Sequence, residues 1–230
     1  MNAAPLAAGI FAKVPRAGFV KTRLVPPLTP EEAARIARVC LEETLRRFPA
    51  EVPAEWTLFL DGEPEAWLRR TAAGRRVGLA GQGAGDLGAR LARAFRGFRD
   101  RGARRAIVIG SDSPTLAPER IRSAIECLED ADVVLGPTRD GGYYLVGAGV
   151  PCEELFARIP WGTDRVLAET MKRAAESGWR VTTLPAWYDL DGIQDLRRAA
   201  LDAAALPALG ALLASLLDRL REPGEAPVRR

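Results

Sequence analysis

The sequence predicts an α/β fold in which helices cover a mostly parallel central sheet. Short apolar runs typical of buried strands alternate along the chain with longer segments of helical periodicity. Such alternation is the pattern of βαβ units, whose successive strands pair in parallel. The chain has 230 residues, enough to bury one full core. We therefore expect a single domain over residues 1–221 and a frayed polar tail over residues 222–230.

The strands are predicted from runs rich in β-branched, aromatic and other apolar residues. The run at residues 106–109 is flanked by turn residues and is typical of a central, buried strand. The run at residues 76–79 is the weakest of the set. The expected strands cover residues 7–14, 55–62, 76–79, 106–109, 131–135, 142–148 and 179–185.

The helices are predicted from apolar residues at helical spacing and from the residues that cap them. The first follows a capping box, with Thr29 as the cap, Pro30 at the first position and Glu32 three residues after the cap. The second has an apolar face and ends at Gly102. The expected helices lie within residues 28–48, 86–102, 118–128 and 163–178.

Composition limits the possible chemistry and partners. The chain contains no histidine, which excludes Ser-His-Asp and Cys-His nucleophile systems and imidazole-bound metals. Any metal must be held by oxygen, which favours Mg²⁺ or Mn²⁺. The 3 cysteines are widely spaced and read as reduced thiols. With a net charge of +3, no dense basic stripe and no membrane-length apolar run, we expect a cytoplasmic protein without nucleic-acid or membrane partners.

Charged residues follow several strands at the edge where α/β sheets bind ligands. Cations come after the first strand, and carboxylates come after three later ones. Together they predict a site for a phosphorylated ligand bridged by a divalent ion. The cations, grouped around Gly18, are Lys13, Arg16, Lys21 and Arg23, and the carboxylates are those of Asp112, Asp140, Asp189 and Asp191.

The loop after the first strand fits neither the Walker phosphate loop nor the dinucleotide fingerprint, because its glycine spacing is wrong. Its side chains would therefore have to hold the phosphates, arginine through paired hydrogen bonds and lysine as a compact charge. A solvated basic loop is the alternative reading of the same residues. The position of the loop directly after the first strand favours a binding role.

Six segments, in their order along the chain, resemble a family of small bacterial transferases. This is the DUF2064 family, also called radical-SAM/selenodomain-associated transferase 1 and often labelled a glycosyltransferase. It is similar to the nucleotide-diphospho-sugar transferase superfamily, which includes molybdenum-cofactor and 2-phospholactate guanylyltransferases. The resemblance covers residues 7–200 and implies a three-layer, GT-A-like fold with a mixed, mostly parallel sheet. The segments are KVPRAGFVKTRL, QGAGDLGARL, GSDSPTL, GPTRDGGYYLVG, PWGT and YDLDGIQDL.

The resemblance implies a divalent ion on Asp112, in the turn after the central strand. The glycosyltransferase Asp-x-Asp pattern is replaced here by Ser-Asp-Ser, so a second carboxylate must come from elsewhere. The late segment DLDGIQD is similar to the acidic segment of the nucleotidyltransferases, and we choose Asp191 over Asp189. The alternative is that Asp191 only caps a helix beginning at Gly192.

The resemblance also implies two binding regions. The nucleotide side comprises the basic loop with Lys13, Arg16, Gly18, Lys21 and Arg23, and a second segment with Gln82, Gly83 and Arg90. For that second segment the alternative is a flexible loop ending in a helix capped by Asp86. The acceptor side comprises Asp140, Gly141, Gly142, Tyr143 and Trp161, for which a plain hairpin turn is the alternative. Tyr143 and Tyr144 should point to opposite faces of their strand.

These residues predict an Mg²⁺- or Mn²⁺-dependent transferase that uses an activated nucleotide, with Lys21, Arg23 and Asp112 in the catalytic role. We favour nucleotidyl transfer from a nucleoside triphosphate to a small phosphorylated acceptor, because four cations suit a triphosphate. A glycosyltransferase with a nucleotide-diphosphate-sugar donor is the alternative. A nucleotide-binding module without catalysis is a third possibility.

Overall fold

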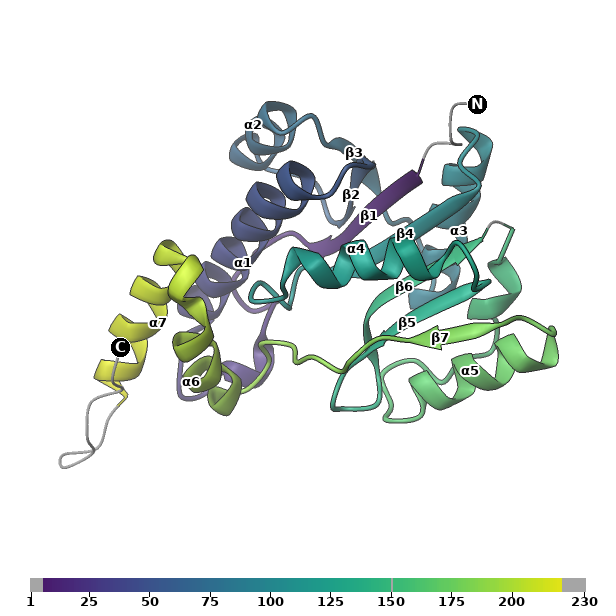
Figure 1. Cartoon of the computed structure of the whole chain (residues 1–230). Coiled ribbons are helices and arrows are strands. Elements are labelled where there is room, and N and C mark those ends of the chain that lie inside the picture. The colour runs from purple at the N-terminus through teal and green to yellow at the C-terminus, as the bar shows by residue number, and fades with distance from the viewer. Residues whose placement is uncertain (1–5, 150, 221–230) are drawn as a thin grey trace.

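The computed structural model describes residues 6–149 and 151–220, and its strands form one seven-stranded sheet with the order β3-β2-β1-β4-β6-β5-β7 (Figure 1). Only β6 runs antiparallel to its neighbours, so the sheet is mixed and mostly parallel, as predicted. The strands are β1 (Leu6–Lys13), β2 (Glu55–Asp61), β3 (Gly78–Gly81), β4 (Arg105–Gly110), β5 (Val133–Pro137), β6 (Tyr143–Gly149) and β7 (Val181–Thr183).

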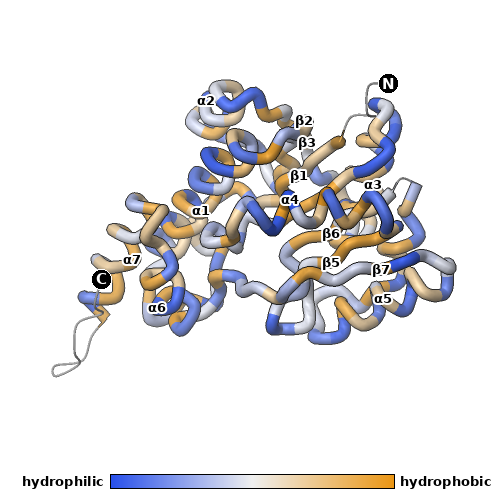
Figure 2. Tube along the Cα trace, viewed as in Figure 1, coloured by the Kyte–Doolittle hydropathy of each residue, from blue (hydrophilic) through white to orange (hydrophobic). Residues whose placement is uncertain are grey.

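Helices cover both faces of the sheet and complete a three-layer arrangement. Buried residues of α1, α2 and α4 pack with one face of the strands, and those of α3 and α5 pack with the other. In Figure 2 the strands are largely apolar, whereas the helices alternate between apolar and polar residues. The helices are α1 (Pro30–Glu51), α2 (Ala66–Gly74), α3 (Leu87–Asp100), α4 (Pro118–Cys127), α5 (Val166–Glu176), α6 (Ile193–Asp202) and α7 (Pro207–Arg219).

The first cap signals in the sequence are confirmed. The Thr29 amide donates to Glu32 at 2.9 Å, and the Glu32 amide donates to the Thr29 hydroxyl at 3.3 Å, which forms the reciprocal capping box of α1. At the start of α3, Asp86 accepts from the Ala89 amide at 2.8 Å. Both helices therefore begin where short-range hydrogen bonding dictates.

Three helices differ from the sequence predictions, and the bounds of the strands differ from them by one or two residues. Helices α2 and α7 were not predicted, and α6 was considered only as an alternative. The third strand covers Gly78–Gly81 rather than residues 76–79, and β5 begins two residues later than expected. Helix α7 packs its leucines in a third apolar cluster with α6 and the start of α1, away from β7 and α5 (Figure 1). The expected frayed tail lies outside the described residues.

The order of the strands positions a binding site between β1 and β4. From β1 the chain adds β2 and then β3 on one side, and β4 returns to pair with the other side of β1. The connections that leave the carboxyl ends of β1 and β4 therefore run in opposite directions, and ligands bind in the crevice at such a switch point. Within the described residues, no helix combines the length and the apolar character needed to cross a membrane.

Candidate functional site

A cavity of about 630 Å³ opens at the carboxyl ends of β1, β2 and β4, a volume within the usual range for small-molecule sites. It lies at the switch point and brings together several chain segments that are distant in sequence. Its lining residues are Phe11, Ala12, Lys13, Phe19, Val20, Lys21, Thr22, Arg23, Ala37, Asp61, Gln82, Gly85, Asp86, Leu87, Arg90, Gly110, Ser111, Asp112 and Asp191.

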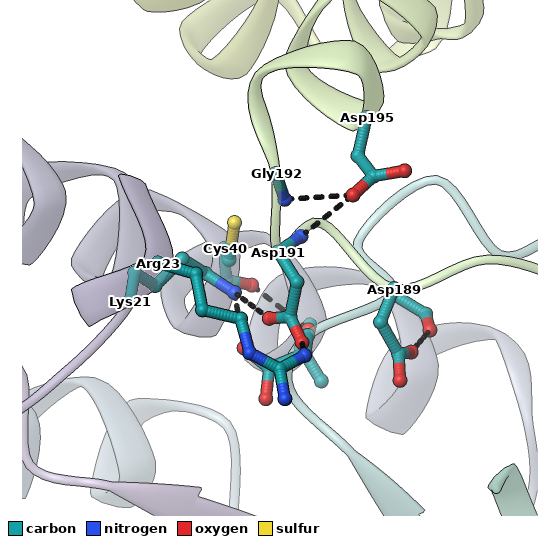
Figure 3. Close-up of polar contacts among 10 residues, drawn as sticks. Lys21, Arg23, Cys40, Asp189, Asp191, Gly192 and Asp195 are labelled. Atoms are coloured by element: carbon teal, nitrogen blue, oxygen red, sulfur yellow. Dashed lines mark hydrogen bonds and ion pairs between the residues drawn. The ribbon is translucent and has the colours of Figure 1, made fainter. Parts of the chain in front are cut away.

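Lys21 lies at the centre of the charged part of this cavity. Its ammonium nitrogen Nζ is 2.5 Å from Oδ1 of Asp112 and 3.6 Å from Oδ1 of Asp191, while only 3% of the side chain is exposed. Arg23 approaches Asp191 from the solvent side, with Nη1 3.6 Å from Oδ2 and 74% of its side chain exposed (Figure 3). The structure thus brings two of the four predicted cations, Lys21 and Arg23, together with the two predicted metal ligands.

These contacts alter the pKa values of the groups involved. Burial alone would lower the pKa of Lys21. The Asp112 carboxylate and smaller contributions from its neighbours act in the opposite direction and together outweigh burial. The pKa of Lys21 is therefore raised and its ammonium group stays charged. Burial raises the pKa of Asp191, and Lys21 opposes that shift. Burial also raises the pKa of the nearby Cys40 thiol to about 12, which leaves the thiol neutral at pH 7.

Asp189 and Asp191 occupy different environments. Asp189 accepts a 2.5 Å hydrogen bond from the Ser113 hydroxyl, and burial raises its pKa to about 6. In Figure 3 its carboxyl group lies apart from the Lys21, Arg23 and Asp191 group, and Asp191 lines the cavity. The choice of Asp191 as the second metal ligand stays a prediction, and this geometry favours it.

The alternative in which Asp191 caps helix α6 is wrong. The Asp195 carboxylate accepts from the Gly192 amide at 2.7 Å and from the Asp191 amide at 3.2 Å (Figure 3). Gly192 is the residue that precedes the helix. Because Asp195 satisfies these amides, the Asp191 side chain is available to the cavity.

The segment expected near the nucleotide base is held by side-chain contacts within the protein. The Gln82 amide nitrogen donates at 3.1 Å to the carbonyl oxygens of Ala12 and Phe59, so this donor is already engaged. A Cβ atom at Gly83 would lie 2.6 Å from an Arg93 nitrogen, and Gly83 does not line the cavity. Base contacts by Gln82 and Gly83 are therefore not favoured by this geometry.

Arg90 does face the cavity, in a fixed position. Its guanidinium lies 2.8 Å from the Asp61 carboxylate and donates to Gln82 Oε1 at 3.1 Å and to the Gly85 carbonyl at 3.0 Å. Such a network aligns the guanidinium without long side-chain motions. Arg90 is thus the second-segment residue whose predicted nucleotide contact fits the structure.

The basic loop contributes unequally to the cavity. Lys13, Lys21 and Arg23 line it, whereas Arg16 and Gly18 do not. Gly18 has a φ of 79° and open space around its Cα, which indicates that it is needed for the turn. Ligand contacts by Arg16 and Gly18 are therefore not favoured by this geometry.

The predicted acceptor residues lie in the turn between β5 and β6, at the start of β6 and in the loop before α5, and none of them lines this cavity. The Asp140 carboxylate accepts from the Thr138 hydroxyl at 2.5 Å and from the Gly142 amide at 3.3 Å, as in a turn. It still affects the pKa of Asp191, which Asp140 raises after the larger contributions of burial, Lys21, Asp112 and Arg23. Asp140 is therefore near enough to add to the negative charge around Asp191, while its own hydrogen bonds are those of the turn.

Gly141, Tyr143 and Trp161 are engaged in packing. A Cβ atom at Gly141 would lie 2.7 Å from the Asp164 Cα, so the glycine is needed where two loops meet. The Tyr143 ring packs edge-to-face against Trp161 at 6.2 Å between centroids, and the Tyr143 hydroxyl is buried beside Thr170. Tyr143 and Tyr144 do belong to opposite apolar clusters. Neither tyrosine lines the cavity.

Sequence reasoning missed two apolar residues of the cavity. Phe19 and Leu87 line it, and these residues are 73% and 42% exposed, so the cavity wall presents apolar surface to solvent. Phe19 lies in the basic loop and Leu87 at the start of α3. An exposed aromatic within the cation-rich motif was the available signal.

The donor set at Asp112 and Asp191 fits a magnesium-type ion that also binds phosphate. Their side chains are 53% and 41% exposed, so oxygen atoms remain accessible from the cavity. No cluster of three or more acidic, histidine or cysteine side chains placed to hold a metal occurs among the described residues. An ion here would take its other ligands from phosphate oxygens and water, as Mg²⁺ commonly does.

Known structures and proteins resemble this chain along much of its length. A candidate nucleotide-diphospho-sugar transferase from Desulfovibrio desulfuricans G20 superposes with a TM-score of 0.84 at 28% identity, covering 95% of this chain and 97% of that one. A cytidylyltransferase from Leptospira borgpetersenii serovar Hardjo-bovis superposes with a TM-score of 0.58 at 12% identity over 95% of this chain and 96% of that one. At that identity the likeness shows the fold alone.

A 2-phospho-L-lactate guanylyltransferase from Methanopyrus kandleri is 33% identical over 99 residues, which are 41% of this chain and 49% of the relative. The chain thus matches about half of the length of this curated relative. Residues 44–163 match the model of a bacterial family described as "Uncharacterized protein conserved in bacteria (DUF2064)". With more than half of its residues in that match, and with the fold of the nucleotide-diphospho-sugar transferases, the chain belongs to the DUF2064 family.

Proposed function

We propose that the protein is a transferase that acts on an activated nucleotide, and that it transfers a nucleotidyl group from a nucleoside triphosphate to a small phosphorylated acceptor. The observation that carries this proposal is the meeting of Lys13, Lys21, Arg23 and Arg90 with Asp112 and Asp191 in one cavity. The guanylyltransferase relative and the nucleotide-diphospho-sugar transferase neighbour support it.

The reaction needs positioning and charge stabilisation rather than a covalent enzyme intermediate. An oxygen of the acceptor phosphate attacks the α-phosphorus, the bond to the bridging oxygen breaks, and pyrophosphate leaves. Lys21 and Arg23 lie where they can hold the phosphates and stabilise the charge that develops on the leaving group. A divalent ion held by Asp112 and Asp191 would supply further neutralisation of the phosphates.

The two sides of the cavity suggest where each substrate binds. Phe19 and Leu87 offer apolar surface to a nucleobase, next to the fixed guanidinium of Arg90. We place the acceptor towards the turn between β5 and β6, because the Asp140 carboxylate in that turn contributes to the negative charge around Asp191. Tyr143 and Trp161 would support this region through packing rather than through direct contacts.

A nucleotide-diphosphate-sugar donor is the second candidate, favoured by the 28% identical neighbour from D. desulfuricans. Thermal-shift screening of nucleoside triphosphates and nucleotide-diphosphate sugars, each with and without Mg²⁺, tests both. A ligand present at about 100 times its Kd raises the free energy of unfolding by ~2.7 kcal/mol. For a chain of this size, the melting temperature would rise by about 5–11 °C. We expect a triphosphate to stabilise the protein most, and only with Mg²⁺.

The product then identifies the reaction. Nucleotidyl transfer releases pyrophosphate, whereas glycosyl transfer releases a nucleoside diphosphate. Release of a nucleoside diphosphate from a nucleotide-diphosphate-sugar donor would contradict nucleotidyl transfer. Stabilisation by a nucleotide without product, across a panel of phosphorylated acceptors, would instead indicate a binding module.

A further inference from the structure

The ammonium group of Lys21 lies between the two carboxylates proposed to hold a divalent ion. It contacts Oδ1 of Asp112 at 2.5 Å and Oδ1 of Asp191 at 3.6 Å. Asp112 follows β4 and Asp191 precedes α6, so two distant segments meet at one lysine. The ammonium therefore already neutralises the pair from within the protein.

The local backbone fixes Lys21 in this position. Its φ and ψ of 48° and 39° lie in the left-handed region, which residues other than glycine adopt at a cost. The side chain is almost fully buried, with 3% exposed, beside the neutral Cys40 thiol. A solvated loop lysine would need neither feature, so the loop is built to direct this side chain inward.

A divalent ion bound by both carboxylates would lie next to this ammonium, whichever side it entered from. The two positive charges would repel each other in a partly buried site. The ion would then bind weakly unless Lys21 moved to another partner. Nucleotide phosphates in the same cavity are such a partner, because Lys21 lines it.

We propose that Lys21 is an internal counter-ion that competes with the divalent cation for Asp112 and Asp191, an inference that rests on the function proposed above. Without nucleotide, the protein binds the cation weakly because the lysine occupies the shared position. When phosphates draw Lys21 away, the carboxylates are released to the cation. By thermodynamic linkage, cation and nucleotide then raise each other's affinity equally.

Binding of Mn²⁺ alone, measured from the loss of the free-ion electron paramagnetic resonance signal, tests this inference. Lys21→Met removes the charge at similar length, and Lys21→Gln keeps a hydrogen-bond donor without the charge. We expect both variants to bind Mn²⁺ about tenfold or more tightly than the wild-type protein. Adding Asp191→Asn to Lys21→Gln should abolish the gain, since one of the two ligands is lost.

Lys13→Met is the matched control, because Lys13 lines the same cavity but forms no ion pair with the described residues. It should raise the Mn²⁺ affinity far less than either Lys21 variant. Circular dichroism verifies that each variant is folded. If Lys21→Met does not fold, the Mn²⁺ affinity of Lys21→Gln decides the test. Equal or weaker Mn²⁺ binding by the folded Lys21 variant would overturn the competition. The proposed function has a separate readout, the Mg²⁺-dependent stabilisation of the wild-type protein by nucleotide, and fails only if that is absent.

Discussion

Replacing Asp195 with alanine should loosen the segment that presents Asp191. The Asp195 carboxylate accepts from the amides of Gly192 at 2.7 Å and Asp191 at 3.2 Å. Loss of such a cap costs about 1–2 kcal/mol, which corresponds to about 2–8 °C in the melting temperature of a chain of this length. The amides of Asp191 and Gly192 would lose this acceptor, so the backbone that positions the Asp191 side chain would be less tightly held.

Two measurements separate these effects. Calorimetry without ligand should show the loss of stability, and a thermal shift with nucleotide and Mg²⁺ should show a smaller ligand-induced increase than in the wild-type protein. Asp195→Asn retains an accepting oxygen and should keep most of the stability and most of the ligand-induced thermal shift.

Asp100→Ala is the control for removing an aspartate, because Asp100 is 64% exposed at the end of α3 and should change stability by less than about 0.5 kcal/mol. If Asp195→Ala is as stable as Asp100→Ala, the capping assignment is wrong.

Three further substitutions test the cavity and its supports. Asp112→Asn should abolish Mg²⁺-dependent stabilisation by nucleotide in thermal-shift assays while leaving the melting temperature of the free protein within a few degrees; unchanged Mg²⁺ dependence would remove Asp112 from the site. Phe19→Ala should lower the affinity for a nucleoside triphosphate by about fivefold or more if the base stacks on Phe19. The affinity for inorganic triphosphate, measured by the same calorimetric titration, should not change. Equal losses of affinity for the two ligands would contradict a base contact. Gly88→Ala should destabilise the protein by about 1–3 kcal/mol, because the added Cβ would meet the Phe156 carbonyl and lie 2.6 Å from the Trp161 indole nitrogen. Gly97 lies on the same helix and has room for a Cβ. Gly97→Ala should therefore stabilise the protein by up to about 1 kcal/mol, and urea denaturation measures both effects.

Sequence signals of short range predicted most of the elements. The Thr29 capping box, the Asp86 cap and the apolar runs of the central strands depend on residues within a few positions of each other. Helix α7 was not predicted because it is apolar on several sides. It becomes a helix against α1 and α6, and this packing is not visible in a local pattern.

The candidate site was predicted in its residue types but not in its contacts. Position after a strand selected a set of four cations and four carboxylates that includes Lys21, Asp112 and Asp191, because the carboxyl ends of neighbouring strands meet at one edge. The family resemblance then narrowed the carboxylates to Asp112 and Asp191. The Lys21–Asp112 pair joins residues 91 positions apart, and its geometry depends on the order of the strands. The packing role of Tyr143 was hidden for the same reason, since its partner Trp161 lies on a separate loop.

The central place of β1 has a consequence for how the family is delimited. Strand β1 is hydrogen-bonded to β2 on one side and to β4 on the other, yet it lies outside the matched residues 44–163. Lys21 and Asp191 lie outside them as well. The segment that is recognisable across the family is therefore not a folding unit: a fragment cut at those bounds would expose the inner edges of β2 and β4 as two unpaired templates for aggregation.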